Sequence, residues 1–332
     1  FGGIGGASRL GILVKGSNYL ETLSHAETVV FDKTGTLTDG SFNVVAVHPS
    51  SGIDPDRLLS IAAHAEAYSN HPIALSVRAA YSGPIDQQRI DDVQEQSGHG
   101  VRARIDEHVV LVGNDKLMSE CGVGCHDCEL TGTILHVSLD GEYIGHIVIA
   151  DVVKPDAAEA VAALRAAGVK KTVMLTGDSR ARAEKIADEV GMSEVNAQLL
   201  PDEKLEKAEL LKKDGALLYV GDGINDAPVM AVADCSVSMG KLGSAAAVEA
   251  SDLVLISDNL RAIPRCVRIA RKTRKIVTEN IAFSIAMKVA FMALGVAGVM
   301  PLWLAVFADV GVMLLAVLNS LRMRLKIRGE GV

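Results

Sequence analysis

The residues best suited to chemistry begin with Asp32, which directly follows a short apolar stretch. Residues 28–31 read Thr-Val-Val-Phe, which is typical of a buried parallel strand. Residues 32–38 then read Asp-Lys-Thr-Gly-Thr-Leu-Thr, which breaks the strand pattern. An aspartate at the carboxyl end of such a strand can attack a phosphoryl group while loop N–H groups hold the phosphate oxygens. We therefore predict phosphoryl transfer with Asp32 as nucleophile; the alternative is a capped strand-to-helix turn.

Two further strand ends carry polar residues of the same kind. Residues 172–175 are followed by Thr-Gly-Asp, and residues 216–220 are followed by Gly-Asp-Gly-Ile-Asn-Asp-Ala-Pro. Right-handed crossovers place such strand ends at one edge of a sheet, where we expect these loops to meet Asp32. Acidic loops that meet repel one another unless a cation lies among them, and oxygen ligands favour Mg²⁺. The candidate residues are Thr176, Asp178, Asp222, Asn225 and Asp226, with Lys204 as a fixed positive charge beside the phosphate.

The elements that must position these residues alternate between strands and helices, which predicts a doubly wound parallel sheet. The pattern begins in residues 24–41, is interrupted, and resumes in residues 148–262. The interruption, residues 42–147, contains a helical pair at 56–80 and later strand-like runs between Gly and Asp turns. It predicts an inserted α+β domain of ordinary size.

The apolar residues of the chain concentrate near its end. Two apolar runs predict transmembrane helices at about residues 278–300 and 302–321, separated by Pro301. Basic residues precede the first run and follow the second, so the positive-inside rule places both outer ends, and the catalytic domains, in the cytoplasm. Each run holds one ionisable residue, Lys288 and Asp309, which predicts that both face a bundle interior. They form either a structural pair or a cation ligand with its counter-ion.

Composition narrows the function classes further. The formal net charge of −8 argues against a general nucleic-acid binder, and five cysteines without a secretory signal suggest a cytosol-facing body. Three of the cysteines, Cys121, Cys125 and Cys128, lie close together with His126. This spacing fits either a structural loop or a metal site. The chain opens at Phe1, and residues 1–23 are expected to be the end of an upstream membrane helix and a connector, so we expect a C-terminal piece of a longer protein.

The three strand-end segments at Asp32, Thr176 and Asp222, with Lys204 between the second and the third, resemble the motifs of P-type ATPases within the haloacid dehalogenase-like superfamily. The resemblance implies a phosphorylation domain, an inserted nucleotide-binding domain, a two-helix transmembrane hairpin, and Asp32 as acceptor of the γ-phosphate of ATP. It implies Mg²⁺ held by Asp32, Asp222 and the backbone carbonyl of Thr34. It also implies that Thr176 and Lys204 bind phosphate oxygens, while Asn225 and Asp226 complete the shell. Thr34 replaces the second aspartate of related phosphatases, so the aspartyl phosphate is expected to hydrolyse slowly.

The inserted domain and the hairpin resemble one subfamily, the heavy-metal-transporting pumps. In the insertion the resemblance implies a nucleotide site formed by Glu66, His71, Gly98, Gly100, Gly113 and Asn114. In the hairpin, Lys288 and the Asp-Val-Gly segment at Asp309 resemble the zinc-, cadmium- and lead-exporting subgroup. This likeness implies Asp309 as a ligand of the transported cation and Lys288 as its internal counter-ion. Which of these metals is exported stays open.

Two features of such pumps are absent from the printed sequence, a Cys-Pro-Cys membrane motif and a Thr-Gly-Glu segment. We therefore expect the rest of the same pump as a partner, and no transport by this chain alone. Three alternatives remain: a membrane-anchored phosphatase of the same superfamily, a non-catalytic metal sensor or scaffold, and a P-type pump for copper or potassium.

Overall fold

The computed structural model describes residues 2–125, 132–222, 226–239, 249–299 and 301–323. The chain divides into two compact units, Phe1–Leu37 with Pro155–Val332, and Thr38–Lys154. The predicted insertion of residues 42–147 lies inside the second unit.

The first unit contains a seven-stranded sheet in the order β1-β13-β12-β11-β2-β9-β10. Every neighbouring pair is parallel except β1 with β13. All five residues of β2 are buried, because its β-branched and aromatic side chains lie between layers on both faces. The strands are β1 (Ile12–Val14), β2 (Thr28–Asp32), β9 (Lys171–Leu175), β10 (Glu194–Asn196), β11 (Leu217–Gly221), β12 (Cys235–Met239) and β13 (Leu253–Leu255).

Helices of this unit pack on the sheet and set the loops at its edge. Side chains of α8 and α9 share a core with β2, β9 and β11. Helix α8 begins at Pro201, whose missing N–H costs nothing in a first turn, and Glu203 accepts a hydrogen bond from the amide of Leu200. The helices are α1 (Gly2–Ser8), α2 (Ser17–Ser24), α6 (Ala157–Ala166), α7 (Arg180–Val190), α8 (Pro201–Lys213) and α9 (Ala227–Val232).

The second unit is a six-stranded antiparallel sheet in the order β3-β8-β7-β6-β5-β4, with α3 and α4 sharing its core. Its strands are β3 (Thr38–Pro49), β4 (Ile90–Gln96), β5 (Gly100–Ile105), β6 (His108–Gly113), β7 (Thr133–Leu139) and β8 (Glu142–Val153). Its helices are α3 (Pro55–Ala65), α4 (Pro72–Ala80), the short turn η2 (Gln87–Arg89) and α5 (Asp115–Glu120). The helical pair predicted at residues 56–80 is confirmed, whereas the sequence analysis missed β3 and β4.

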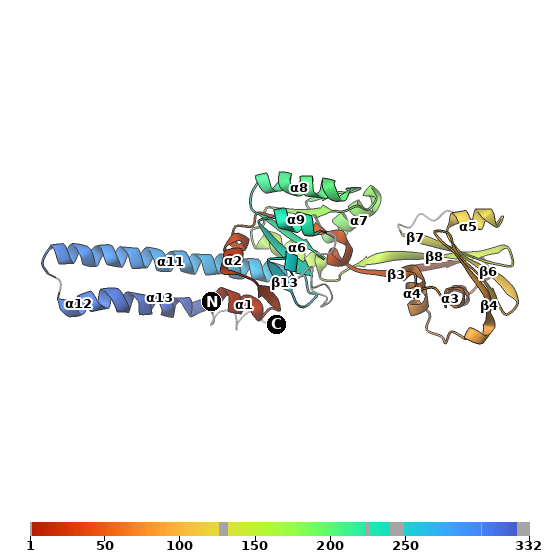
Figure 1. Ribbon diagram of the computed structural model, residues 1–332, viewed down its shortest axis with the longest axis horizontal. Helices are drawn as coiled ribbons and strands as arrows, with labels where there is room; N and C mark the ends of the chain where they lie inside the picture. Colours follow the sequence, from red (N-terminus) through yellow and green to blue (C-terminus); the bar gives the residue numbers. More distant parts are fainter. Residues whose placement is uncertain (1, 126–131, 223–225, 240–248, 300, 324–332) are drawn as a thin grey trace. The chain divides into compact units, whose positions relative to one another are not determined.

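The last part of the first unit is a helical hairpin, in which α11 (Ala262–Val296) lies beside α12 (Leu302–Val306) and α13 (Val312–Ser320) (Figure 1). A π-helical turn, η3 (Phe307–Gly311), joins the latter two without leaving helical backbone angles. Asn319 donates a hydrogen bond of 2.8 Å to Asn280, and the rings of Phe291 and Phe307 meet edge to face at 6.5 Å. These contacts fix the two helices side by side.

The hairpin presents apolar side chains outward. Among the described residues, α11 is the helix long and apolar enough to cross a membrane, and residues 307–320 form a shorter apolar helix. The first helix ends at Val296 rather than near residue 300, because Gly298 adopts a φ of +73° that closes the helix end. Exposed apolar side chains of the hairpin include Ile281, Ile285, Val289, Met292, Trp303, Val306, Met313, Leu314, Val317 and Leu318.

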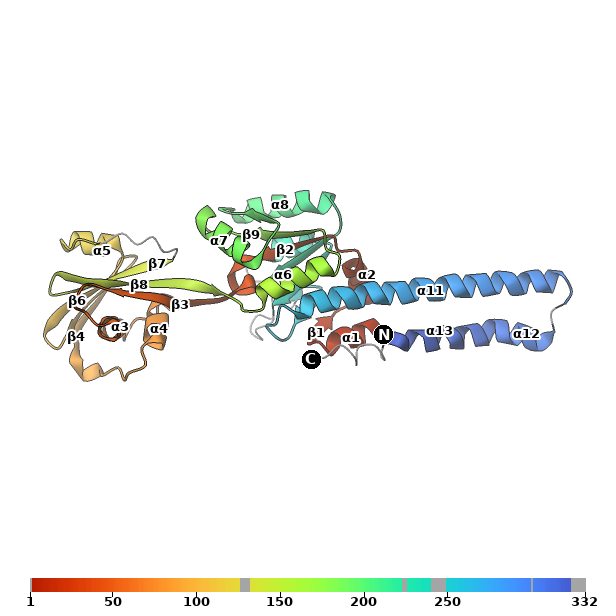
Figure 2. The same ribbon diagram turned by 180° about the vertical axis from the view of Figure 1, so that it is seen from behind.

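The predicted connector at the beginning of the chain contains a strand and a helix of its own. Residues 12–14 form β1, which pairs with β13, and residues 17–24 form α2, which packs against α11. Helix α1 lies against α11 as well (Figure 2). Glycine at position 3 allows α1 to lie this close to α11, because a Cβ there would lie 2.5 Å from the hydroxyl of Thr273.

Candidate active site

Three neighbouring strands of the first unit end at the same edge of the sheet. Strand β2 lies between β9 and β11, with Asp32 paired to Leu175 and Phe31 paired to Val220. The next residue after each of these strand partners is therefore close to Asp32. This register brings the loops that begin at Thr176 and Gly221 to the predicted nucleophile.

Lys204 joins two of the aspartates predicted for this edge. Its Nζ lies 2.7 Å from Oδ1 of Asp32 and 3.2 Å from Oδ1 of Asp226. Asp32 is 7% exposed and Asp226 is 2% exposed, so both ion pairs are shielded from solvent. Lys204 reaches them from the first turn of α8, where Pro201 and Glu203 set the start of the helix. Lys204, Asp32 and Asp226 therefore lie together at this edge of the sheet, as the sequence predicted.

The cluster carries an excess of negative charge. The pKa of Asp32 is raised to about 6; burial is the largest cause, Asp226 and Asp222 add to the rise, and Lys204 partly offsets it. Burial lowers the pKa of Lys204, but the neighbouring carboxylates more than compensate, so the lysine pKa is raised overall. The carboxylates of Asp226 and Asp222 make the surroundings of Asp32 negative, which favours a bound cation.

The loop that follows Asp32 adds a close approach to Asp222. Gly35 has a φ of +71°, and a Cβ on it would lie 3.7 Å from Cβ of Asp222. Oδ2 of Asp226 is buried and has no hydrogen-bond partner among the described residues. Clustered carboxylates with an unused oxygen fit a magnesium ion. Asn225, which was also predicted for this shell, lies outside the described residues.

Thr176 and Asp178 occupy different positions in this neighbourhood. Thr176 is buried, and its hydroxyl accepts a hydrogen bond of 3.1 Å from the amide of Asp178. The carboxylate of Asp178 is ion-paired with Lys33 at 2.8 Å. This pair ties the loop after β9 to the loop after β2. Lys33 is a residue that the sequence analysis did not single out, and its position directly after Asp32 was the available signal.

Tyr219 is a second residue that the sequence analysis missed. It lies fully buried in β11, and burial together with Asp226 and Asp32 raises its pKa well above the usual value. The tyrosine is therefore neutral, and a Cβ on Gly221 would contact both its ring and Asp226. No sequence signal distinguished it from an ordinary core residue.

The second unit contains a cavity of about 230 Å³. All six residues predicted for nucleotide binding line it: Glu66, His71, Gly98, Gly100, Gly113 and Asn114. The lining also includes Ser69 and Glu95, which the prediction did not name.

Backbone shape dominates one wall of this cavity. Gly100 has a φ of +145°, and a Cβ there would lie 2.2 Å from the carbonyl oxygen of Val112. Gly113 pairs with Gly100 and is equally confined. Asn114 donates a hydrogen bond of 2.8 Å to the carbonyl of Gly98 and accepts one from Leu117, so it also caps α5.

The lining of this cavity also carries titratable groups. Glu66 is 4% exposed, and burial raises its pKa to about 7, with Glu95 adding to the rise and Arg78 opposing it. His71 caps α4, because its Nδ1 accepts a hydrogen bond from the amide of Ile73. In the neutral ring Nε2 is then the protonated nitrogen. The lining of the cavity therefore offers hydrogen-bond donors as well as acceptors near neutral pH.

The two ionisable residues of the hairpin lie at nearly the same depth. Lys288 comes three residues before Phe291, and Asp309 two residues after its ring partner Phe307, so their axial offset is about 1.5 Å. Both side chains are exposed, and no ion pair joins them in the described part of the hairpin. Asp309 lies in the π-helical turn η3, a feature often found at functional sites.

Comparisons with known proteins agree with this geometry. The sequence profile of haloacid dehalogenase-like hydrolases matches residues 26–234. The chain belongs to the haloacid dehalogenase-like hydrolase family. The matched residues include the strand ends that meet Asp32 and the whole of the inserted second unit.

Curated relatives carry the resemblance over nearly the whole chain. A cadmium, zinc and cobalt-transporting ATPase of Bacillus subtilis is 50% identical over 98% of this chain and 47% of its own length. A zinc-transporting ATPase of Synechocystis is 49% identical over 97% of this chain and 45% of its own length. The predicted kinship with metal-transporting P-type ATPases is confirmed, and this haloacid dehalogenase-like chain spans about half the length of these relatives.

Solved structures support the same kinship. A zinc-transporting PIB-type ATPase in the E2.Pi state superposes with a TM-score of 0.87 and 34% identity, covering 97% of this chain and 54% of that chain. The catalytic domain of the CPx-ATPase CopB-B, studied upon nucleotide binding, superposes with a TM-score of 0.61 and 29% identity. The latter match covers 79% of this chain and 97% of that chain.

Proposed function

We propose that this chain carries the ATP-binding and phosphorylated parts of a membrane pump that exports a divalent heavy metal. The observation that carries the proposal is the buried ion-paired cluster in which Lys204, from the first turn of α8, meets Asp32 and Asp226 at the ends of the adjacent strands β2 and β11. A carboxylate held by a lysine, with further carboxylates beside it, suits phosphoryl transfer better than a purely structural role.

The proposed reaction transfers the γ-phosphoryl group of ATP to Asp32. A carboxylate oxygen of Asp32 attacks the γ-phosphorus, and the bond from that phosphorus to the β–γ bridging oxygen breaks. ADP leaves with that electron pair, and an aspartyl phosphate remains. Lys204, together with the hydroxyl of Thr176, would hold the phosphoryl oxygens as charge shifts toward the leaving group.

The resident cation would be Mg²⁺, held by Asp32, Asp222 and the backbone carbonyl of Thr34, with Asn225 and Asp226 completing the shell. When bound, it supplies positive charge that lets carboxylate and phosphate approach each other. Thr34 stands where related phosphatases have a second aspartate. The side chain of Thr34 cannot act as a general base at neutral pH, which favours a long-lived aspartyl phosphate.

The nucleotide would bind in the cavity of the second unit. Glycines at positions 98, 100 and 113 allow its backbone to come close, and His71 and Glu66 offer one donor and one titratable carboxyl. A buried carboxyl that is half protonated near pH 7 can present either a donor or an acceptor to a heterocycle. This is the part of the chain that would recognise the base.

The hairpin would carry part of the metal path across the membrane, with the catalytic units on the cytoplasmic side. Asp309 would be the cation ligand, since it lies in the π turn η3, a feature often found at functional sites. Lys288, at the same depth, would be the internal counter-ion. Zinc and cadmium are the proposed cargo, since both occur in the names of the relatives.

A phosphorylation assay tests the proposal. The purified chain in detergent, given Mg²⁺ and ATP labelled at the γ-phosphate, should acquire an acid-stable, hydroxylamine-sensitive label. Asp32→Asn should abolish it, while Asp202→Asn, which alters an exposed carboxylate of α8, should not. Unchanged labelling of Asp32→Asn would contradict the proposal, and rapid turnover of small phosphomonoesters would favour the phosphatase alternative.

A further inference from the structure

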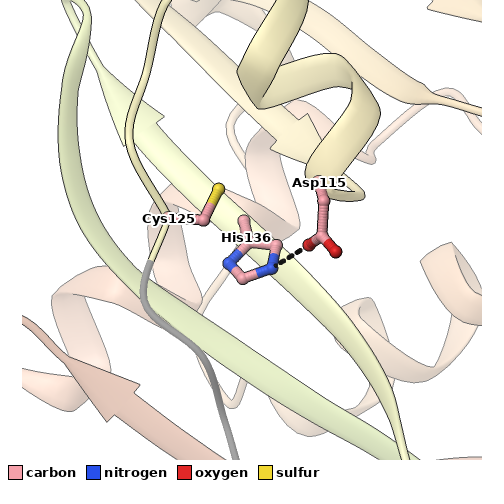
Figure 3. A group of neighbouring side chains, drawn as sticks. All are labelled: Asp115, Cys125 and His136. Atoms are coloured by element: carbon pink, nitrogen blue, oxygen red, sulfur yellow. Dashed lines mark ion pairs between the residues drawn. The ribbon is translucent and has the colours of Figure 1, made fainter.

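A second cluster of ligand-type side chains lies in the second unit, away from the proposed nucleotide cavity. Asp115 opens α5, Cys125 lies in the loop after that helix, and His136 lies in β7 (Figure 3). One donor atom from each residue comes within 4.8 Å of the other two. None of the three lines the cavity, although their neighbours Asn114 and Leu135 do.

His136 is held so that one ring nitrogen faces this cluster. The residue is 1% exposed, and its Nδ1 is 3.1 Å from the hydroxyl of Tyr143. Its Nε2 lies 2.6 Å from Oδ1 of Asp115, yet this nitrogen makes no hydrogen bond of acceptable geometry with any described residue. A buried imidazole fixed through one nitrogen, with the other beside a carboxylate and a thiol in the same cluster, is suited to bind a metal ion.

We propose that Asp115, Cys125 and His136 form a binding site for a divalent cation of borderline softness, for which Zn²⁺ is the best match. Thiolate, imidazole and carboxylate are the three ligand types that Zn²⁺ accepts together. The thiol disfavours Mg²⁺ and Ca²⁺, which take oxygen ligands. Three protein ligands leave a fourth tetrahedral position for water, on the side where Asp115 is exposed.

The spacing of the donor atoms is close to what the cation requires. Ligands around tetrahedral Zn²⁺ lie about 3.3–3.8 Å from one another, given bonds of about 2.0–2.3 Å. The contact between His136 and Asp115 must therefore open slightly, and the longest separation must shrink. The carboxylate of Asp115 is 81% exposed, so its side chain can rotate without disturbing packed neighbours. Binding would tie α5 and the loop after it to β7.

Cobalt substitution provides a direct test on the full chain in detergent, after metal has been removed with a chelator. Bound Co²⁺ should give a thiolate-to-metal charge-transfer band and the visible bands of a tetrahedral site, and Zn²⁺ should displace it. Cys125→Ser should lose the charge-transfer band. Asp115→Asn should bind Zn²⁺ at least about tenfold more weakly.

Two control variants assign the signal to this cluster. Cys121→Ser removes an exposed thiol nearby, and Glu142→Gln removes an exposed carboxylate at the start of β8; both should keep the band and the affinity. A charge-transfer band that persists in Cys125→Ser, or one that disappears in Cys121→Ser, would overturn the assignment. Because Asp115 is exposed, its variant should fold normally, so equal Zn²⁺ affinity in Asp115→Asn and the unaltered chain would also overturn it. None of these outcomes depends on phosphorylation at Asp32.

Discussion

The cluster of Asp32, Lys204 and Asp226 and the cavity of the second unit depend on different features of the chain. The cluster depends on charged side chains: Lys204 is held between Asp32 and Asp226, and all three are shielded from solvent. The cavity depends on backbone shape, because Gly100 and Gly113 leave no room for a side chain. In the cluster the charge of each side chain is required. In the cavity the absence of a side chain at each glycine matters most. Substitutions that separate charge from shape therefore test this comparison.

The largest effect is expected for Lys204→Met. This change leaves two buried carboxylates without their counter-charge, which should destabilise the first unit by about 3 kcal/mol. Labelling by ATP should fall by about 100-fold or more, because the positive charge beside the phosphoryl group is lost. Initial labelling rates and denaturant unfolding measure the two effects.

Lys207→Met is the matched control for this prediction, since Lys207 is exposed on the same helix. It should leave both quantities nearly unchanged. Normal labelling of Lys204→Met would mean that charge in the cluster is structural rather than catalytic.

The next effect concerns shape. Gly100→Ala would place a Cβ 2.2 Å from the carbonyl oxygen of Val112 at a φ of +145°. We expect a loss of about 3 kcal/mol in the second unit and no measurable nucleotide binding. Hydrogen exchange of the β5 and β6 amides reports the stability of this unit.

Gly98→Ala separates space from backbone conformation. Gly98 also has a positive φ, +75°, but no atom lies within 4 Å of its added Cβ. It should cost only about 1 kcal/mol. Equal losses at the two positions would show that the confined approach at Gly100 has no special importance.

A third prediction uses the pH dependence of Glu66. Its pKa is about 7 in the folded chain against 4.5 as the ordinary value, so the folded state binds more protons between these pH values. Stability should therefore fall as the pH rises, by about 2.5 kcal/mol between pH 5 and pH 8 from this group. Glu66→Gln removes this titrating group, so the stability of the second unit, measured by hydrogen exchange, should depend less on pH in this variant. A profile that keeps the same slope would place the titration elsewhere.

The smallest effect separates capping from binding at His71. His71→Ala removes the N-cap of α4 and should cost about 1 kcal/mol, whereas His71→Asn keeps a capping side chain and should cost little. Both should weaken nucleotide binding about tenfold, because both lose the imidazole donor. Calorimetric titration with ATP measures the binding. Full affinity in His71→Asn would reduce the histidine to a structural role.

The sequence predicted the strand ends around Asp32, but not every strand of the fold. Asp32 and Asp222 follow apolar strands, and strand ends in a parallel sheet meet at one edge, so local pattern was sufficient. Strand β4 was missed because five of its seven residues are exposed and polar, and β3 was missed because its apolar residues, Phe42 and 44–47, show no regular alternation. Strand β1 was missed because three residues are too short to show a period.

The segment around Cys125 also shows that spacing along the chain does not reveal which residues lie together in space. The sequence suggested a group of Cys121, Cys125, His126 and Cys128, of which His126 and Cys128 lie outside the described residues. The structure places Cys125 with Asp115 and His136 instead. These two partners come from α5 and β7, and nothing in their spacing along the chain relates them to the cysteine.

The sequence by itself determined which residues stand at strand ends, where the sheet is interrupted, and which segments are apolar enough for a membrane. These properties follow from the order of neighbouring residues. Tertiary structure decided that Lys204 reaches Asp32 across 172 positions, that Asp178 pairs with Lys33, and that Gly100 meets Val112. Such contacts depend on the register between strands and on the direction in which each side chain leaves its helix or strand. A local pattern does not contain that information, because pairing is settled only when the whole core packs.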